Sequence, residues 1–256
     1  MNAPPRILTI AGSDSSGGAG IQADIKTITM LGGYAMTAIT TVTAQNTQGV
    51  QAVKVLSPAL VAAQIDACIG DIGVDAVKIG MLGSAEIAEK VLDRLADLSV
   101  PVVFDPVMIA TSGDKLADGA TIAVFERLMA IATLTTPNVH ELAALGGDPG
   151  MMKRGCAYLA KGGDAVGEVI EDRLIVPGQA ARVWQSPRIA TRHTHGTGCT
   201  LASAIATYLG RGLDLEASVE RARQVVLQAL RSAPGLGAGQ GPLGHHTVIM
   251  DQQSSS

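Results

Sequence analysis

Short runs of β-branched and aliphatic residues alternate along this chain with longer segments of helical period. The runs that predict strands are Ile7–Ile10, Thr37–Thr43, Ala76–Ile79, Val100–Phe104, Leu134–Thr135 and Ala157–Lys161. Such alternation favours right-handed crossovers between parallel strands, with helices covering both faces of one sheet. We therefore predict an α/β fold in a single domain, built on a mainly parallel central sheet.

Capping residues mark the predicted helices. In the segment 84–98, Ser84 can cap the free amides and Glu86 lies in the first turn, while Ser57-Pro58 predicts another helix start. The last predicted elements are helices at Cys199–Leu209 and Leu215–Ser232 and a strand at His246–Met250. We expect the domain to span residues 6–250, with disordered ends at 1–5 and 251–256.

Composition excludes several classes of function. Only 2% of the residues are aromatic and the net charge is -4, so the chain offers neither stacking platforms nor a basic stripe for nucleic acid. No run of about 18 apolar residues occurs, which is the length that a membrane span needs. The three cysteines are too widely spaced for a structural zinc cluster. We predict a cytoplasmic enzyme of a small molecule.

The loop Gly196-Thr197-Gly198-Cys199 precedes an apolar helix and predicts an anion site. Free amides at a helix start can stabilise negative charge on a transferring phosphoryl group. The positive end of the helix dipole should favour the Cys199 thiolate, and so a role as a base near neutral pH. The alternative is a buried, inert cysteine in a packing turn.

Two further loops follow predicted strands, where α/β sheets bind their ligands. The glycine-rich loop 11–20 leads into a helix, and its backbone could approach a polar ligand, although a tight turn would need the same glycines. Asn138 and Glu141 lie three residues apart and could order water and Mg²⁺ beside phosphates. Locally, the sequence favours an ordinary capping box as the role of these two residues.

Taken in order, these loops resemble the hydroxymethylpyrimidine and phosphomethylpyrimidine kinases of thiamine biosynthesis, which have a ribokinase-like fold. The resemblance extends from Ile7 to Met250 through the motifs AGSDSSGGAGIQADIKT, AQNTQGVQAV, KIGML, DPVM, TPN with NxxE, KGG and THGTGCT. It implies ATP and Mg²⁺ as cofactors, a pyrimidine substrate and a homodimer. It also implies phosphorylation of 4-amino-5-hydroxymethyl-2-methylpyrimidine and then of its monophosphate.

The resemblance assigns roles to individual residues. The ring would lie near Gly12, Asp24, Gln45, Met81 and Val107, with Asp24 and Gln45 hydrogen-bonding its substituents. Asp105, Asn138 and Lys161 would bind the nucleotide, and Glu141 the metal. Gly196, Thr197, Gly198 and Cys199 would form the catalytic loop, with Cys199 where sugar kinases of this fold place an aspartate. The residues alone favour core positions for Met81 and Val107, and roles as local caps for Asp24 and Gln45.

The chain departs from the family pattern at three places. Thr111 stands where lysine is common, and Asp164 follows KGG where histidine is common. Losing a cation and adding a carboxylate should weaken binding of an anionic substrate, which bears on the second phosphorylation. The segment 139–160 is shortened, so we expect only one helix there, at Val139–Gly147.

Two other functions fit the same residues. Pyridoxal or pyridoxine kinase is a close alternative, because those substrates also carry a hydroxymethyl group on a nitrogen ring. A catalytically degenerate protein that only binds the pyrimidine is a second alternative, suggested by the shortened segment and by Thr111.

Overall fold

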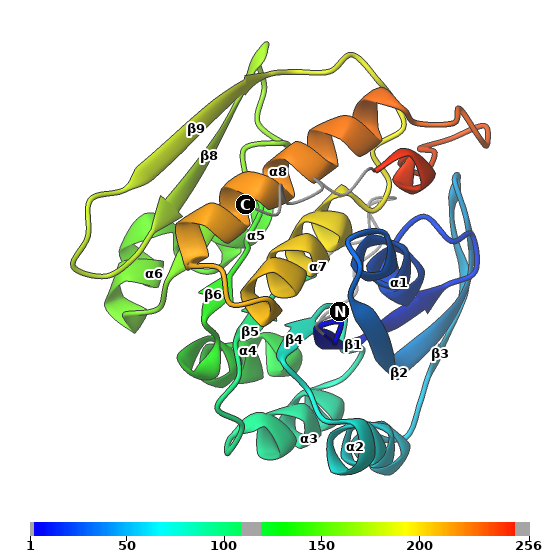
Figure 1. The fold of residues 1–256 in the computed structure, drawn as a ribbon, viewed down its shortest axis with the longest axis vertical. Helices are drawn as coiled ribbons and strands as arrows, with labels where there is room; N and C mark the ends of the chain where they lie inside the picture. The colour runs from blue at the N-terminus through cyan, green and yellow to red at the C-terminus, as the bar shows by residue number, and fades with distance from the viewer. Residues whose placement is uncertain (1–2, 109–118, 249–256) are drawn as a thin grey trace.

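The computed structural model describes residues 3–108 and 119–248. The strands in this part of the chain form one sheet in the order β3-β2-β1-β4-β5-β6-β7-β8-β9 (Figure 1). Their bounds are β1 Arg6–Asp14, β2 Tyr34–Asn46, β3 Gly49–Val55, β4 Ala76–Ile79, β5 Val102–Phe104, β6 Leu134–Thr135, β7 Tyr158–Ala160, β8 Val169–Ile175 and β9 Arg182–Pro187. The adjacent strands β2, β1, β4, β5, β6 and β7 pair in parallel. The strands β3, β8 and β9 at the two edges are antiparallel to their neighbours. The prediction of a mainly parallel sheet is confirmed.

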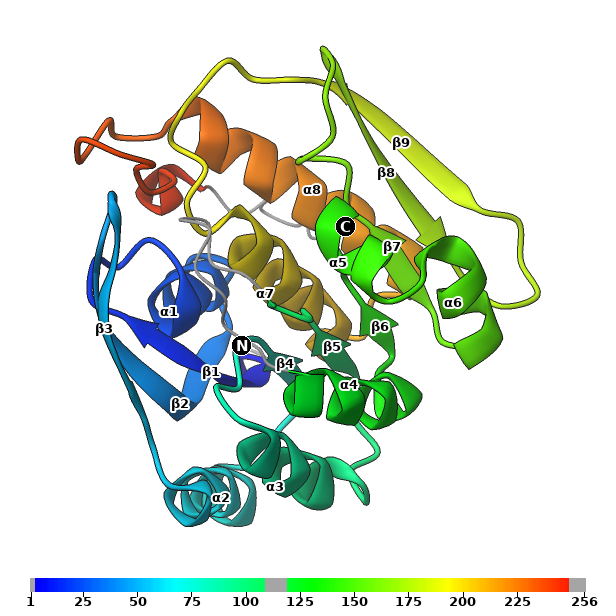
Figure 2. The same cartoon turned by 180° about the vertical axis from the view of Figure 1, so that it is seen from behind.

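Helices cover both faces of this sheet, as predicted (Figures 1 and 2). One face carries α1 Gly20–Met30, α7 Thr197–Gly210 and α8 Leu215–Arg231. The other carries α2 Pro58–Ala67, α3 Ala85–Leu95, α4 Gly119–Ile131 and α6 Gly147–Arg154, while α5 is the short helix Val139–Ala144. Side chains alternate between the two faces along each strand. In β4, Val77 and Ile79 face α2–α4, which places Ala76 and Lys78 on the side of α7.

The caps read from the sequence are present. Ser57 accepts a hydrogen bond from the Leu60 amide, and Ser84 accepts one from the Ile87 amide. These caps fix where α2 and α3 begin, because each satisfies an amide that has no partner inside the helix. Phe104 and Phe125 pack edge to face, with 5.0 Å between their ring centroids, and this contact joins β5 to α4 in the core.

Two local predictions are wrong. The segment 139–160 holds α5 and α6 rather than one helix. His246–Met250 is not a strand in its described part, because His245–Thr247 forms a 3₁₀ turn. The backbone there bonds to α8 instead of a sheet edge, with the Gly244 amide donating to the Ala229 carbonyl at 2.8 Å.

The ends of the chain are described only in part. The Pro5 carbonyl accepts a hydrogen bond from the Tyr34 amide at 2.8 Å, so the chain joins the sheet from that point. Residues 251–256, for which we predicted disorder, lie outside the described residues. The domain limits of 6 and 250 therefore stay a prediction. Among the described helices, none is long and apolar enough to cross a membrane.

Candidate active site

A cavity of about 930 Å³ opens at the carboxyl ends of the parallel strands, beside the first turn of α7. Its size is that of a site for small molecules. All the predicted site residues except Asp24 line it: Gly12, Gln45, Met81, Asp105, Val107, Asn138, Glu141, Lys161, Gly196, Thr197, Gly198 and Cys199. The loops that the sequence separates by up to about 180 positions thus meet in one place, as the rule for α/β sheets requires.

The loop before α7 has the geometry of an anion site. Gly196 has a φ of 87°, and a Cβ atom there would lie 1.9 Å from the Gly18 carbonyl oxygen. The loop therefore packs directly on the first glycine loop, and only glycine fits at position 196. No side chain of the described residues caps α7, so its first turn presents backbone amides to the cavity.

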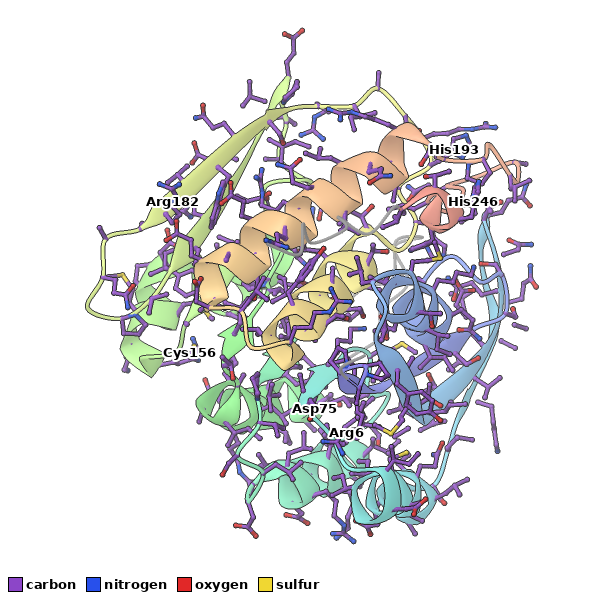
Figure 3. All side chains as sticks on the ribbon, in the orientation of Figure 1. Arg6, Asp75, Cys156, Arg182, His193 and His246 are labelled. Carbon is purple, nitrogen blue, oxygen red and sulfur yellow. The ribbon has the colours of Figure 1, made fainter. Side chains whose placement is uncertain are left out.

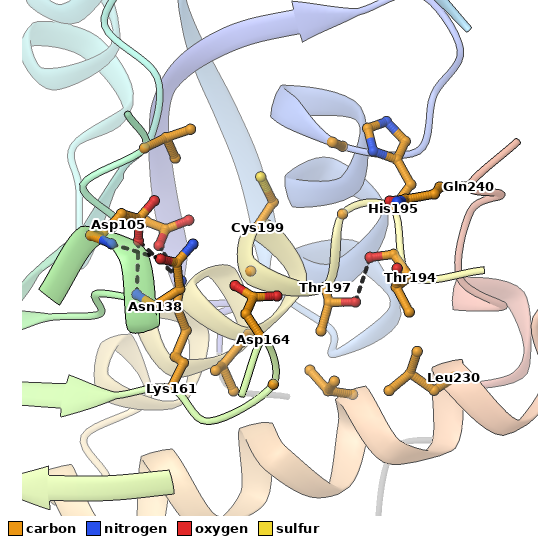
Figure 4. A pocket seen from close by; sticks show the side chains of 18 of the residues that line it. Asp105, Asn138, Lys161, Asp164, Thr194, His195, Thr197, Cys199, Leu230 and Gln240 are labelled. Atoms are coloured by element: carbon orange, nitrogen blue, oxygen red, sulfur yellow. Dashed lines mark hydrogen bonds and ion pairs between the residues drawn. The ribbon is translucent and has the colours of Figure 1, made fainter. Parts of the chain in front are cut away.

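Cys199 lies between two groups of polar residues, with Asp105, Asn138 and Lys161 on one side and His195, Thr194 and Thr197 on the other (Figure 4). Burial raises the pKa of the Cys199 thiol to about 11, although Lys78 and a hydrogen bond from the Gly20 amide favour the thiolate. The expectation of a lowered thiol pKa is therefore wrong for the free enzyme. Loss of water around the sulfur outweighs the helix dipole.

A lysine between two carboxylates faces Cys199. Lys161 Nζ lies 2.7 Å from Asp105 Oδ1 and 4.0 Å from Glu141 Oε2. A Cβ atom on Gly198 would lie 3.3 Å from Lys161 Nζ, so the ammonium group is directly beside the start of α7. Burial raises the pKa of Glu141 to about 7, against the pull of Lys161 and with the help of Asp105.

Asn138 and Glu141 form the capping box of α5. The Asn138 side chain accepts from the Glu141 amide, and Glu141 accepts from the Asn138 amide, both at 2.8 Å. Among the described residues, no group of three His, Cys, Asp or Glu side chains is arranged for a metal ion. The oxygen donors of Asp105 and Glu141 still fit Mg²⁺, because that ion usually takes its other ligands from phosphates and water.

A contact between a histidine and an aspartate joins the two glycine loops. His195 Nε2 lies 2.7 Å from Asp14 Oδ2, and Gln45 Nε2 lies 3.4 Å from the same His195 nitrogen. Burial opposes ionisation of Asp14, but hydrogen bonds from His195, Ser16 and Ala19 lower its pKa to about 2. His195 therefore orients the loops, in keeping with its position next to Gly196.

Asp24 requires a correction. It is fully buried, does not line the cavity, and accepts hydrogen bonds from Thr9, Lys78 and Ser203. These bonds use both carboxylate oxygens, so Asp24 is not placed to bind a ring. The sequence could not reveal this, because its main partner, Lys78, lies 54 positions away on β4.

Sequence reasoning missed Asp14, Lys78 and Arg188. Asp14 ends β1 inside a motif that we had singled out, and that position was the available signal. Arg188 follows β9, a strand that we did not predict, and its guanidinium donates to the carbonyls of Gly163, Ala165 and Gly167. It thereby holds the loop that carries Asp164 against the cavity.

A parallel α/β sheet with an uncapped helix start, a cysteine and a lysine between carboxylates at its carboxyl edge defines a ribokinase-like small-molecule kinase. The chain belongs to the phosphomethylpyrimidine kinase family, whose model matches residues 14–244. The predicted family and fold are confirmed.

Individual relatives agree with this assignment. A hydroxymethylpyrimidine/phosphomethylpyrimidine kinase of Streptomyces coelicolor is 44% identical over 256 residues, covering 94% of each chain. The solved phosphomethylpyrimidine kinase of Clostridium difficile has a TM-score of 0.77 and 36% identity, over 88% of this chain and 99% of that one. An ADP complex of Bacillus subtilis pyridoxal kinase has a TM-score of 0.87 and 32% identity, over 94% of this chain and 97% of that one.

Proposed function

We propose that this enzyme transfers the γ-phosphoryl group of ATP to the hydroxymethyl group of 4-amino-5-hydroxymethyl-2-methylpyrimidine, and then phosphorylates the monophosphate. One observation carries the proposal: in a chain of this family, a single cavity joins Gln45 to the Gly198–Cys199 turn and Lys161. A ring held at one end would place its alcohol at the start of α7.

The pyrimidine end of the cavity is shaped by Gly12, Gln45, Met81 and Val107. A Cβ atom on Gly12 would lie 2.3 Å from Met81 Cε and 2.5 Å from Thr41 Oγ1, so the first glycine loop packs closely on both side chains here. The Gln45 side chain is held between Thr43 and His195. A fixed amide that must pair with the ring discriminates strongly against ligands lacking the matching group.

In the transfer to the alcohol, the hydroxyl oxygen attacks the γ-phosphorus, its proton passes to the thiolate of Cys199, and the bond from the γ-phosphorus to the bridging oxygen breaks to release ADP. The amides at the start of α7 and the Lys161 ammonium stabilise the charge that develops on the phosphoryl oxygens. Mg²⁺ held by Glu141 and Asp105 would neutralise phosphate charge. Because the free thiol has a raised pKa, this chemistry should become faster as pH increases.

A coupled assay of ADP release tests the proposal with each pyrimidine separately. We expect turnover with the alcohol and with the monophosphate. If neither compound is turned over, the assignment as a pyrimidine kinase is refuted, and a protein that only binds the pyrimidine is favoured. Asp164 lines the cavity, whereas Thr111 lies outside the described residues. A rate with the monophosphate well below that with the alcohol would agree with the added carboxylate of Asp164.

Pyridoxal phosphorylation is the second candidate, favoured by the close structural similarity to the Bacillus subtilis pyridoxal kinase. Competition between pyridoxal and hydroxymethylpyrimidine separates the two, because the preferred substrate has the higher kcat/KM. Our proposal also includes a homodimer in the cytoplasm, and sedimentation of the purified protein checks the dimer.

Nucleotide binding should depend on Arg188. Its three hydrogen bonds hold the loop 163–167, which faces Leu227 and Leu230 of α8 across the cavity. We expect Arg188→Ala to raise the KM for ATP about three- to tenfold with little change in kcat, because ordering the loop then costs binding energy. Arg182→Ala is the control, since Arg182 pairs with Glu216 outside the cavity. An unchanged KM for ATP would contradict this role.

Activation by Mg²⁺ should weaken in acid. Since the pKa of Glu141 is raised to about 7, its carboxyl group is mostly protonated below that pH and cannot bind a cation. The Mg²⁺ concentration for half-maximal activity should increase about fivefold from pH 7 to pH 6. Glu141→Gln keeps the shape of the capping residue and should remove this pH dependence. An equally steep dependence in that variant would contradict the assignment.

A further inference from the structure

Lys78 is a charged residue at a position where a strand of this sheet would ordinarily place an apolar one. It is fully buried in β4, on the face covered by α7. A buried lysine is retained only when it is paired, because removing its charge from water is unfavourable. Lys78 Nζ lies 2.9 Å from Asp24 Oδ2, and the same carboxylate accepts from Thr9 and Ser203.

This ion pair lies beneath the first turns of α7. Ser203, which binds Asp24 Oδ1 at 2.7 Å, is four residues after Cys199 and so lies on the same face of the helix. The ammonium group lies near Gly80, the residue after β4, and near Ala11 in β1. A Cβ atom on Gly80 would lie 2.8 Å from Lys78 Nζ and 3.1 Å from Ala11 Cβ. Ala11 and Met81, next to Gly80, both line the cavity.

Four charged groups act on Cys199, each from a different part of the sheet or its helices. They are Lys78 on β4, Asp24 on α1, Asp105 after β5 and Lys161 after β7. Lys78 lowers the pKa of Cys199, whereas the carboxylates of Asp24 and Asp105 raise it. Lys78 Nζ lies at the strand end beside Ala11, a residue of the cavity wall, so the positive end of the buried pair is the end next to the cavity.

We propose that Lys78 is a positioning residue for phosphoryl transfer: its buried ammonium stabilises the Cys199 thiolate from beneath α7, and Asp24 serves as its counterion instead of a substrate ligand. The inference deepens the proposed function, because it rests on Cys199 as the proton acceptor. It explains how a buried thiol that favours its neutral form can still accept a proton. Lys161 lies on the opposite, substrate-facing side and is already committed to Asp105 and Glu141.

Alkylation of Cys199 by iodoacetamide tests this without any nucleotide, with the extent read at each cysteine by mass spectrometry. In Lys78→Met/Asp24→Asn, both charges are gone, and we expect Cys199 to react about threefold more slowly at every pH from 7 to 9. The thiolate is then scarcer but each thiolate is a stronger nucleophile, so the two changes partly offset. The kcat of this double variant should also decrease, whereas its affinity for the pyrimidine should stay within twofold of the wild type.

Asp24→Asn alone should change the alkylation rate of Cys199 in the opposite direction. The amide oxygen keeps an acceptor for Lys78, Thr9 or Ser203 while the negative charge is lost, so Cys199 should react about threefold faster at pH 7. This variant also keeps the proposal falsifiable where the double variant folds poorly. Cys68 is an internal reference, because its reactivity should not change in either variant.

Arg6→Met/Asp75→Asn is the matched control. This ion pair joins the start of β1 to the residue before β4, with Arg6 Nη2 2.6 Å from Asp75 Oδ1, away from the cavity (Figure 3). It should leave Cys199 alkylation unchanged. The proposal is overturned where the folded double variant reacts at the wild-type rate, or where Asp24→Asn and the double variant shift in the same direction. Failure of the proposed function is seen separately, as full activity in Cys199→Ala.

Discussion

Replacing Cys199 with alanine is expected to lower kcat about a hundred- to ten-thousandfold, which is the usual contribution of a positioned acid or base. The sulfur lies at the start of α7, where the acceptor alcohol and the phosphoryl group would meet. In the proposed function Gln45, Met81 and Val107 would hold the ring through other contacts, so the dissociation constant of the pyrimidine should stay within about threefold. Steady-state kinetics and isothermal titration calorimetry measure the two quantities.

Two further variants at this position separate the base from the shape of the site. Cys199→Ser keeps the size but carries a hydroxyl group that ionises far less readily, so it should be nearly as slow as alanine. Cys199→Asp introduces the group that sugar kinases of this fold use, and should restore part of the rate, most clearly below pH 7. A Cys199→Ala enzyme with more than a tenth of the wild-type kcat would contradict the base assignment.

The elements that the sequence predicted are those with strong local signals. Ser57 and Ser84 begin α2 and α3 as expected, because a side-chain cap is a contact between residues three positions apart. β3, β8 and β9 were missed: Val53, Val169 and Val183 are exposed, so these strands lack the apolar alternation of a core strand. The turn at His245–Thr247 depends on bonds to α8, which no local pattern contains.

The site shows the same division. Strand-end loops could be assigned from their position, so Gln45, Lys161 and Cys199 meet as predicted. The protonation of Cys199 could not be assigned, because the helix dipole is visible in the sequence while the burial that opposes it is a property of the packed fold. The burial of Lys78 could not be predicted either, because its partner Asp24 lies 54 positions away in the sequence.

Lys161→Met should be nearly as damaging as loss of Cys199, by a different route. Its ammonium group lies beside the start of α7, because a Cβ atom on Gly198 would lie 3.3 Å from Lys161 Nζ. We expect kcat to fall about a hundred- to a thousandfold, because charge on the transferring phosphoryl group would lose a preorganised partner. Pyrimidine affinity should be unchanged, since Lys161 and His195 lie on opposite sides of Cys199 and Gln45 contacts His195 (Figure 4).

The control must distinguish the charge of Lys161 from its packing between Asp105 and Glu141. Lys161→Arg keeps a cation and should recover part of kcat, whereas Lys153→Met removes an exposed lysine of α6 and should change nothing. Without Lys161 the two carboxylates repel each other, so the pKa of Glu141 should increase further and the Mg²⁺ requirement should become steeper below pH 8. A Lys161→Met enzyme that loses less than tenfold in kcat, with the wild-type Mg²⁺ dependence, would show that the amides of α7 stabilise the transferring group without help from this cation.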